Sequence, residues 1–205
     1  MAGGRLGAAR AGRDGPVAWV PTLLRGRPRR AIDLVRQPRS QRPREVWLVI
    51  VDASASTRRN QGLSLAKGVL AQAFDDAYRR RARLALLTAS GQEPRWQYQG
   101  LKASRALQGW LAQLGAGGGT PLEAALQLAA QWLEQRRRRH PSEQQRLLLL
   151  TDGRLARLPA LPALNCAGVL VDLENGPIRL GRARALAEGL ALDYCHVQAL
   201  PTLPA

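Results

Sequence analysis

The sequence predicts an α/β fold, with a doubly wound, mainly parallel sheet of six strands and helices on both faces. Short, continuous apolar runs recur along the chain, which is typical of parallel strands buried on both faces. Between them lie longer segments whose apolar residues recur every three or four positions, which indicates helices that turn one face to the sheet. Because the two patterns alternate, parallel crossover units are favoured over a helical bundle or a β-sandwich.

The strand pattern occurs in six segments, residues 46–51, 84–87, 96–99, 147–150, 169–171 and 194–198. The segment 96–99 alternates only weakly, so we expect it at an edge of the sheet. Helical spacing occurs in four segments, residues 62–80, 102–114, 121–139 and 180–190. The arginines at 136–139 end one of these helices, where the helix dipole favours cations, and we interpret them as a solvated terminus.

The first 44 residues differ from the rest in composition. They are rich in Gly, Pro and Arg, and their 11 arginines against two acidic residues account for +9 of the net charge of +16. We expect the apolar residues within 17–24 to pack on the main domain, and residues 32–35 to form a short edge strand. The predicted organisation is a partly ordered basic arm over residues 1–44 and one domain over residues 45–202.

Several classes of protein are disfavoured by simple features of the chain. No apolar run approaches the roughly 20 residues of a membrane-spanning helix, and the first residues lack the apolar stretch of a secretory signal, so we expect a cytoplasmic protein without membrane contact. Cys166 and Cys195 are far apart and form no CxxC pair, so they predict neither a disulfide framework nor a zinc site, and we expect both to be buried and inert.

The basic charge raises the alternative of nucleic-acid binding. The Arg-rich segment has no aromatic residue except Trp19, and no zinc-finger, RNP or homeodomain pattern is present. A docking or solvated role for the basic arm is therefore favoured, with nucleic-acid binding kept as the less favoured alternative.

Polar residues that suit a metal ion follow the predicted strands. Ligands of open α/β sheets bind beyond the carboxyl ends of the strands. Two carboxylates and three hydroxyls are expected to meet at that edge, namely those of Asp52, Ser54, Ser56, Thr120 and Asp152. No thiolate or imidazole is expected to join them. This all-oxygen set suits Mg²⁺, with Ca²⁺ or Mn²⁺ as alternatives, and argues against zinc or copper.

The spacing of these residues has a mechanical reason. Alternate positions 52, 54 and 56 can direct three side chains to one ion, while the intervening alanines let the loop turn tightly. The three glycines at 117–119 allow the backbone before Thr120 to approach the same point without a Cβ clash.

The pattern Asp52-x-Ser54-x-Ser56, followed by Thr120 and then Asp152, resembles the metal-ion-dependent adhesion site of von Willebrand factor type A (VWA) domains. The resemblance implies a Rossmann-like, three-layer fold in which the two serines and the threonine ligate the ion, and the aspartates do so directly or through water. It also implies an open coordination position that a partner's acidic side chain can complete.

Further motifs are similar to the C-terminal domain of the magnesium chelatase D subunit. They include Ala66-Lys67-Gly68, the segments 76–81 and 117–122, and the tail from Asp172-Leu173-Glu174 to Glu188, so that the similarity covers roughly residues 17–200. The chain departs from that family at Ala55-Ser56-Thr57, where Gly-Ser-Met is usual. It also contains no GxxxxGK[ST] phosphate loop, so we expect a stand-alone form of the domain.

The resemblance implies an accessory subunit, not catalytic alone, of a chelatase-like complex that inserts Mg²⁺ or Co²⁺ into a tetrapyrrole, as in cobalamin biosynthesis. The expected partners are an AAA+ ATPase of the chelatase I type and a large catalytic subunit. Four arginines near the metal loops are expected to attract an acidic partner: Arg58, Arg59, Arg154 and Arg157. The alternative within the same class is a VWA module that serves an AAA+ ATPase unrelated to tetrapyrroles.

Overall fold

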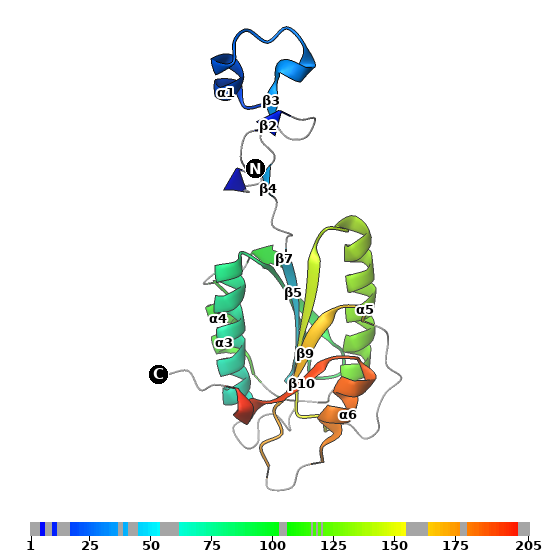
Figure 1. Cartoon of the computed structure of the whole chain (residues 1–205). Helices are drawn as coiled ribbons and strands as arrows, with labels where there is room; N and C mark the ends of the chain where they lie inside the picture. Colours follow the sequence, from blue (N-terminus) through cyan, green and yellow to red (C-terminus); the bar gives the residue numbers. More distant parts are fainter. Residues whose placement is uncertain are drawn as a thin grey trace. The chain divides into compact units, whose positions relative to one another are not determined.

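The computed structural model describes residues 5–6, 10–11, 17–36, 39–40, 45–53, 62–102, 106–115, 117, 119, 121–154, 164–176 and 180–200. The chain divides into two compact units, Met1–Arg44 and Glu45–Ala205, and each is described by itself (Figure 1). That residues 1–44 act as a partly ordered arm packed on the main domain stays a prediction.

The second unit contains one six-stranded sheet with the strand order β10-β9-β8-β5-β6-β7. All neighbouring strands are parallel except β6 and β7, which are antiparallel. The strands are β5 (Glu45–Asp52), β6 (Arg83–Ala89), β7 (Arg95–Lys102), β8 (Gln144–Thr151), β9 (Ala167–Asp172) and β10 (Asp193–His196). The predicted six-stranded, mainly parallel sheet is confirmed, with the weakly alternating segment at an edge as β7.

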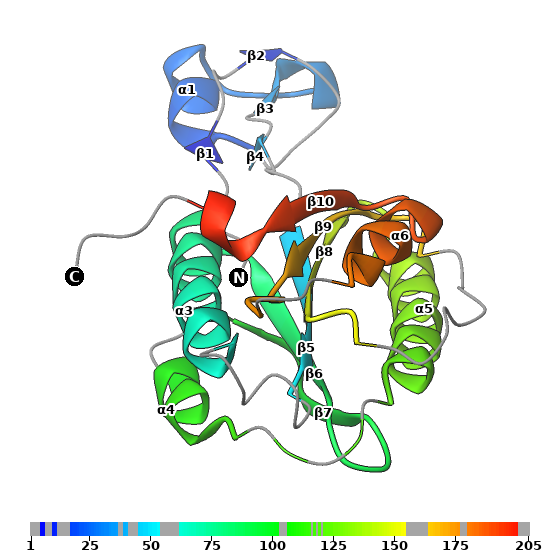
Figure 2. The same cartoon turned by 90° about the horizontal axis from the view of Figure 1, so that it is seen from below.

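Helices cover both faces of this sheet. Figures 1 and 2 show α3 and α4 on one face, and α5 and α6 on the other. Their bounds are α3 (Gly62–Arg80), α4 (Ala106–Gln113), α5 (Leu122–Arg139) and α6 (Arg182–Gly189). The unit is therefore a three-layer α/β structure, as the alternating pattern predicts.

Strand β5 supplies both apolar cores because successive strand residues point to opposite faces of a sheet. Leu48 and Ile50 belong to the core beneath α5 and α6, whereas Val49 and Val51 belong to the core beneath α3 and α4. All four side chains are buried. The continuous apolar run of this strand is thus explained by burial on both faces.

The structure changes two predicted boundaries. Strand β7 continues to Lys102, whose Cα pairs with that of Arg83, so the helix predicted from residue 102 begins only at Ala106. The antiparallel ladder with β6 outweighs the helical pattern at these residues. Strand β10 ends at His196, and a short 3₁₀ turn, Val197–Ala199, replaces the end of the strand predicted to reach Gln198.

The first unit consists of short elements. They are β1 (Arg5–Leu6), β2 (Arg10–Ala11), α1 (Trp19–Leu24), the 3₁₀ turn η1 (Ala31–Asp33), β3 (Val35–Arg36) and β4 (Arg39–Ser40). The edge strand predicted over 32–35 is wrong except at Val35. Asp33 Oδ2 accepts hydrogen bonds of 2.9 Å from the backbone N–H groups of Arg29 and Arg30, which stabilises a turn there.

Among the described residues, none of the helices is long and apolar enough to cross a lipid bilayer. Both cysteines are half-buried, so the prediction that both are buried is wrong. Burial nevertheless raises the pKa of the Cys166 thiol to about 11, with a smaller opposing effect of the positive charge of Arg137. Cys166 is therefore protonated at neutral pH, in keeping with an unreactive thiol.

Candidate metal centre

Asp52 is the last residue of β5, which lies between β8 and β6, and its side chain is fully buried. The hydroxyl of Thr151 donates a hydrogen bond to Asp52 Oδ2 over 2.7 Å. Thr151 ends the neighbouring parallel strand β8, so this bond joins the carboxyl ends of two central strands. A carboxylate shielded from water in this way strongly favours a nearby cation.

The loop after β8 is shaped by its own hydrogen bonds. The N–H of Gly153 donates to Thr151 Oγ1 over 3.0 Å, and the N–H of Arg154 donates to Asp152 Oδ1 over 3.1 Å. Asp152 is almost fully buried. These contacts hold the second predicted carboxylate next to the strand end that bonds Asp52.

The loop also packs closely on α6. Gly153 has a positive φ of 65°, and a Cβ at this position would lie 2.6 Å from the backbone N of Ala183. No side chain fits this gap, so glycine is required by both the backbone conformation and the close approach. The loop that carries Asp152 is thereby seated on the first turn of α6.

The glycine-rich loop reaches the same edge of the sheet. The N–H of Gly117 donates to the carbonyl oxygen of Ala53 over 2.9 Å, and the N–H of Ala53 donates to Ala89 O over 3.3 Å. A Cβ on Gly119 would lie 3.0 Å from Gly91 O. The loops that precede Thr120 and follow Asp52 are therefore in direct contact, as the sequence pattern predicts.

Of the five predicted metal ligands, the structure describes Asp52 and Asp152, and it brings them to the ends of adjacent strands. Ser54, Ser56 and Thr120 lie outside the described residues. Thr151 is a site residue that the sequence pattern did not single out as a ligand. The feature of the sequence that could have identified Thr151 is a hydroxyl at the last position of a strand buried on both faces.

Of the predicted docking arginines, Arg154 is described, whereas Arg58, Arg59 and Arg157 lie outside the described residues. Arg154 Nε lies 3.8 Å from Glu174 Oε1, and its side chain is 36% exposed. This ion pair directs part of the positive charge of Arg154 toward the buried Glu174, which the sequence did not predict.

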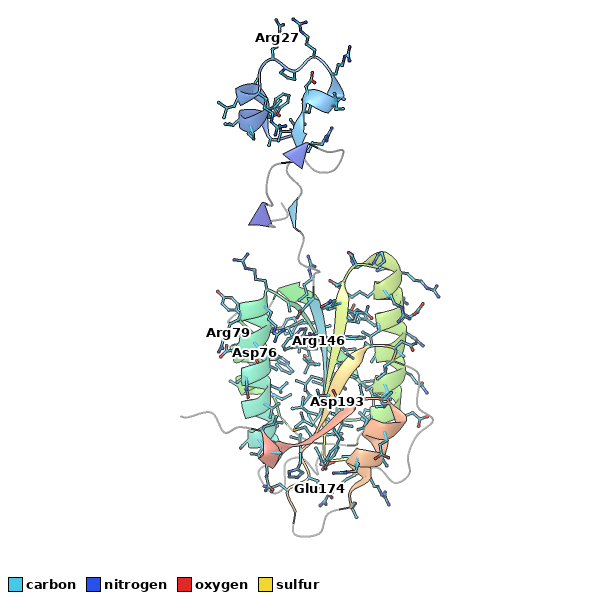
Figure 3. All side chains as sticks on the ribbon, viewed as in Figure 1. Arg27, Asp76, Arg79, Arg146, Glu174 and Asp193 are labelled. Carbon is cyan, nitrogen blue, oxygen red and sulfur yellow. The ribbon has the colours of Figure 1, made fainter. Side chains whose placement is uncertain are left out.

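Two further carboxylates lie at the end of β9, and both are engaged by protein donors. Asp172 Oδ2 accepts from the hydroxyl of Tyr194 over 2.7 Å, and Asp172 Oδ1 accepts from the N–H of Glu174. The buried Glu174 carboxylate accepts from the N–H groups of Leu180 and Gly181, at the start of α6. Figure 3 shows Glu174 at the edge of the sheet where the parallel strands end. These bonds indicate that the two carboxylates hold the loops together.

An open pocket of about 600 Å³ adjoins this edge at the end of β6. Its lining is mostly polar and consists of Thr88, Ser90, Gly91, Gln92, Glu93, Arg95, Gln97 and Gly117. Because Gly117 also bonds Ala53, the pocket lies beside the loops that carry the predicted ligands.

The donor chemistry fits a hard divalent cation. Within the part of the chain that the structure describes, no three His, Cys, Asp or Glu side chains cluster in a way that could hold a metal ion. Asp52 and Asp152 are the two described members of the predicted ligand set, and carboxylate oxygens are ligands that Mg²⁺, Ca²⁺ and Mn²⁺ prefer.

Residues 47–154, more than half of the chain, match the family described as the von Willebrand factor type A domain. The chain belongs to this family. VWA domains mediate protein–protein interactions and often bind a divalent metal ion.

A curated protein is also similar to this chain. An uncharacterized protein of Mycobacterium tuberculosis (strain ATCC 25618 / H37Rv), Rv2850c, is 27% identical over 179 residues, which cover 82% of this chain and 28% of that protein. The chain thus spans less than a third of that relative's length.

Two solved structures show the same fold. A von Willebrand factor type A protein from Catenulispora acidiphila superposes with a TM-score of 0.56 and 21% identity, over 79% of this chain and 40% of the other. An aerotolerance-related membrane protein from Bacteroides fragilis NCTC 9343 superposes with a TM-score of 0.56 and 14% identity, over 75% of this chain and 90% of the other.

Proposed function

We propose that this chain is a metal-dependent docking subunit of a chelatase-like complex. In this proposal it binds Mg²⁺ at the carboxyl edge of its sheet and docks a separate AAA+ ATPase of the chelatase I type. The observation that carries the proposal is the fully buried Asp52 carboxylate, bonded to Thr151 from the next strand, with Asp152 beside it. Protein interaction is the general role of VWA domains, which favours docking over catalysis by the chain alone.

Five side chains would hold the ion: Asp52, Ser54, Ser56, Thr120 and Asp152. Mg²⁺ requires near-octahedral coordination by oxygen, so five protein ligands at most leave one position to water or to an incoming carboxylate. The bound ion would thus supply a positive charge with one open position for an acidic side chain of the ATPase.

Positive charge around the edge supports an acidic partner. Arg154 is more than a third exposed despite its ion pair with Glu174, and Arg58, Arg59 and Arg157 flank the same loops in the sequence. Charge of this kind increases the rate of encounter with an acidic surface and helps to orient it.

The assembly around this contact is part of the same proposal. It would contain a large catalytic subunit that inserts Mg²⁺ or Co²⁺ into a tetrapyrrole, with the VWA chain and the ATPase as accessory subunits. The motifs shared with the magnesium chelatase D subunit support this choice of complex. The alternative, an ATPase unrelated to tetrapyrroles, uses the same metal edge and differs in the third subunit.

The test is retention of a purified chelatase I-type ATPase on the immobilised full-length chain. We expect retention in Mg²⁺, and loss of retention in excess EDTA or with Thr120→Ala, which removes a ligand. Ser142→Ala is the matched control, because Ser142 is an exposed hydroxyl at the opposite edge of the sheet, before β8. Equal retention under all four conditions would show that docking uses another surface.

A chelation assay with the catalytic subunit separates the two kinds of complex. If the ATPase binds in a metal-dependent manner, but the three subunits together insert neither Mg²⁺ nor Co²⁺ into a tetrapyrrole, the chelatase assignment is wrong and the docking role remains.

A further inference from the structure

The side chain of Thr22 links helix α1 to β3 within the first unit. Thr22 is buried, and its Oγ1 donates to Ala18 O over 2.7 Å and accepts from the N–H of Val35 over 3.0 Å. The N–H of Ala18 in turn donates to Val35 O over 2.8 Å. One side of the helix is therefore fixed against β3.

A different side of the helix carries large apolar side chains that are exposed. At about 100° per residue, positions 19, 20, 23 and 24 share one arc of about 140°, and Thr22 lies outside it. Trp19, Val20, Leu23 and Leu24 are 60–83% exposed, and Ile32 in the turn η1 is 80% exposed. We call these five residues the α1 face.

The exposure is concentrated here and not spread over the chain. Among the described residues, seven large hydrophobic side chains are strongly exposed, and the α1 face contains five of them. The other two, Tyr78 and Leu180, are isolated in the second unit. Single exposed apolar residues are common on proteins, whereas four on one side of a short helix indicate a binding surface.

Positive charge borders the α1 face. The turn after α1 carries four exposed arginines, namely Arg25, Arg27, Arg29 and Arg30. Figure 3 shows Arg27 in this turn. Asp33 is the only acidic residue within 17–36, and its carboxylate is engaged by the N–H groups of Arg29 and Arg30. The surface is thus apolar with a cationic border.

We propose that the α1 face binds an acidic amphipathic helix of a partner protein. Its apolar side chains would pack against the apolar stripe of that helix, and the bordering arginines would pair with its acidic residues. This contact goes beyond the proposed metal-dependent docking, since it uses residues of the first unit and needs no metal. It is an alternative to the expectation that the apolar residues within 17–24 pack on the main domain.

Other partners fit the same surface less well. Valine, leucine and isoleucine cannot stack on bases, so a nucleic acid would leave most of the face unsatisfied. Six residues of helix span only about 9 Å, which is short for a helix that anchors a protein in a membrane surface. A helix of another protein is the partner that satisfies both the apolar residues and the arginines.

The probe for this proposal is a fluorescent 18-residue peptide with leucines at helical spacing and glutamates elsewhere, and a scrambled peptide of the same composition is its control. We expect saturable binding of the patterned peptide to the full-length chain, unchanged by EDTA and weakened by salt. Leu23→Ser and Leu24→Ser should each weaken binding about tenfold. Leu180→Ser, which removes an exposed leucine of the second unit, should have no effect.

The charge contribution is tested by a matched pair. Arg27→Glu should weaken peptide binding, whereas Arg79→Glu, on the exposed end of α3, should not. Circular dichroism of each variant verifies that the fold is retained.

Three outcomes would overturn the proposal. The scrambled peptide could bind equally well. Phosphatidylserine vesicles could bind in a Leu24-dependent manner while the patterned peptide does not. Sedimentation could reveal a dimer that Leu24→Ser dissociates, which would make a second copy of the chain the partner. Peptide binding to the α1 face is also measured in EDTA, without a metal ion. A failure of the metal-dependent ATPase retention would therefore leave this proposal intact.

Discussion

The carboxylate of Asp52 is fully buried, at the end of a central strand that is buried over most of its length. Burial of a charge costs several kcal/mol unless hydrogen bonds or a counter-charge compensate it. The hydroxyl of Thr151 provides one hydrogen bond, and a divalent cation would provide the counter-charge. An aspartate is therefore explained at this position by ion binding better than by stability.

This balance predicts the behaviour of Asp52→Asn. The amide keeps an oxygen that can accept a hydrogen bond from Thr151, but the negative charge is lost. Loss of a residue that only supports a metal ligand already lowers metal affinity about 10–100-fold. Loss of this charge should therefore lower the affinity for Mg²⁺ by more than about 100-fold. In EDTA the free energy of unfolding should remain within about 1 kcal/mol of wild type or increase. Calorimetry with Mg²⁺ and urea denaturation measure the two effects. Unchanged Mg²⁺ affinity would mean that the metal site is misassigned.

The Cys166 thiol allows a test of burial by pH. Because its pKa is raised to about 11, the folded state favours the thiol, and its contribution to stability is complete below the ordinary thiol pKa and lost as the pH rises through 11. In Cys195→Ser, we expect iodoacetamide to alkylate Cys166 slowly at pH 8 and faster up to about pH 11. Mass spectrometry measures the rate, and the same variant in urea is the control. A rate that levels off near pH 9 in the folded protein would contradict the shift.

At the scale of elements, the candidate site is organised by contacts between loops and by the start of α6. Glu174 accepts from the N–H groups of Leu180 and Gly181 and pairs with Arg154, so it joins β9, α6 and the loop after β8. Gly153 permits that loop to approach Ala183. The position of Asp152 thus depends on a helix that follows it by about 30 residues in the chain.

Substitutions at two glycines with the same backbone conformation distinguish the cost of backbone strain from the cost of a steric clash. Gly153 and Gly181 have φ of 65° and 66°, but a Cβ on Gly181 meets nothing within 4 Å. Gly181→Ala should therefore cost only the left-handed conformation, about 1–2 kcal/mol. Gly153→Ala should cost about 1–3 kcal/mol more, since the methyl group would displace α6. Urea denaturation compares the two variants, and equal losses of stability would mean that the loop does not depend on α6.

At the scale of the whole molecule, the chain combines a basic first unit with a larger second unit that contains both apolar cores. More than half of the net charge of +16 lies in residues 1–44, whereas every residue of the two core clusters belongs to residues 45–205. More than half of the positive charge is therefore separated in sequence from the apolar cores.

This division predicts that residues 45–205 fold when produced alone. We expect one cooperative urea transition, with a free energy of unfolding within about 1 kcal/mol of that of the full chain, because both cores are retained. Circular dichroism and fluorescence should report the same midpoint. Aggregation or a non-cooperative transition would show that the first 44 residues are needed to complete the domain.

The candidate site was predictable where it depends on local order in the chain. The sequence alone identifies the continuous apolar runs that end in Asp52 and in Thr151-Asp152, because strands buried on both faces need apolar residues at every position. The carboxyl ends of parallel strands must then meet at one edge. The hydrogen bond from Thr151 to Asp52 was not predictable, because it depends on the register between β5 and β8.

The sequence by itself determined the layer order, the position of the acidic loops and the segregation of charge, since these follow from periodicity and composition. The tertiary structure alone decided which of several similar residues are buried and form ion pairs. Four consecutive arginines end α5, and only Arg136 is largely buried, where it contacts Glu143 and the ring of Trp132, which corrects the interpretation of all four as solvated. The physical reason is that neighbours distant in sequence determine desolvation, hydrogen bonding and ion pairing, and only the folded chain brings them together.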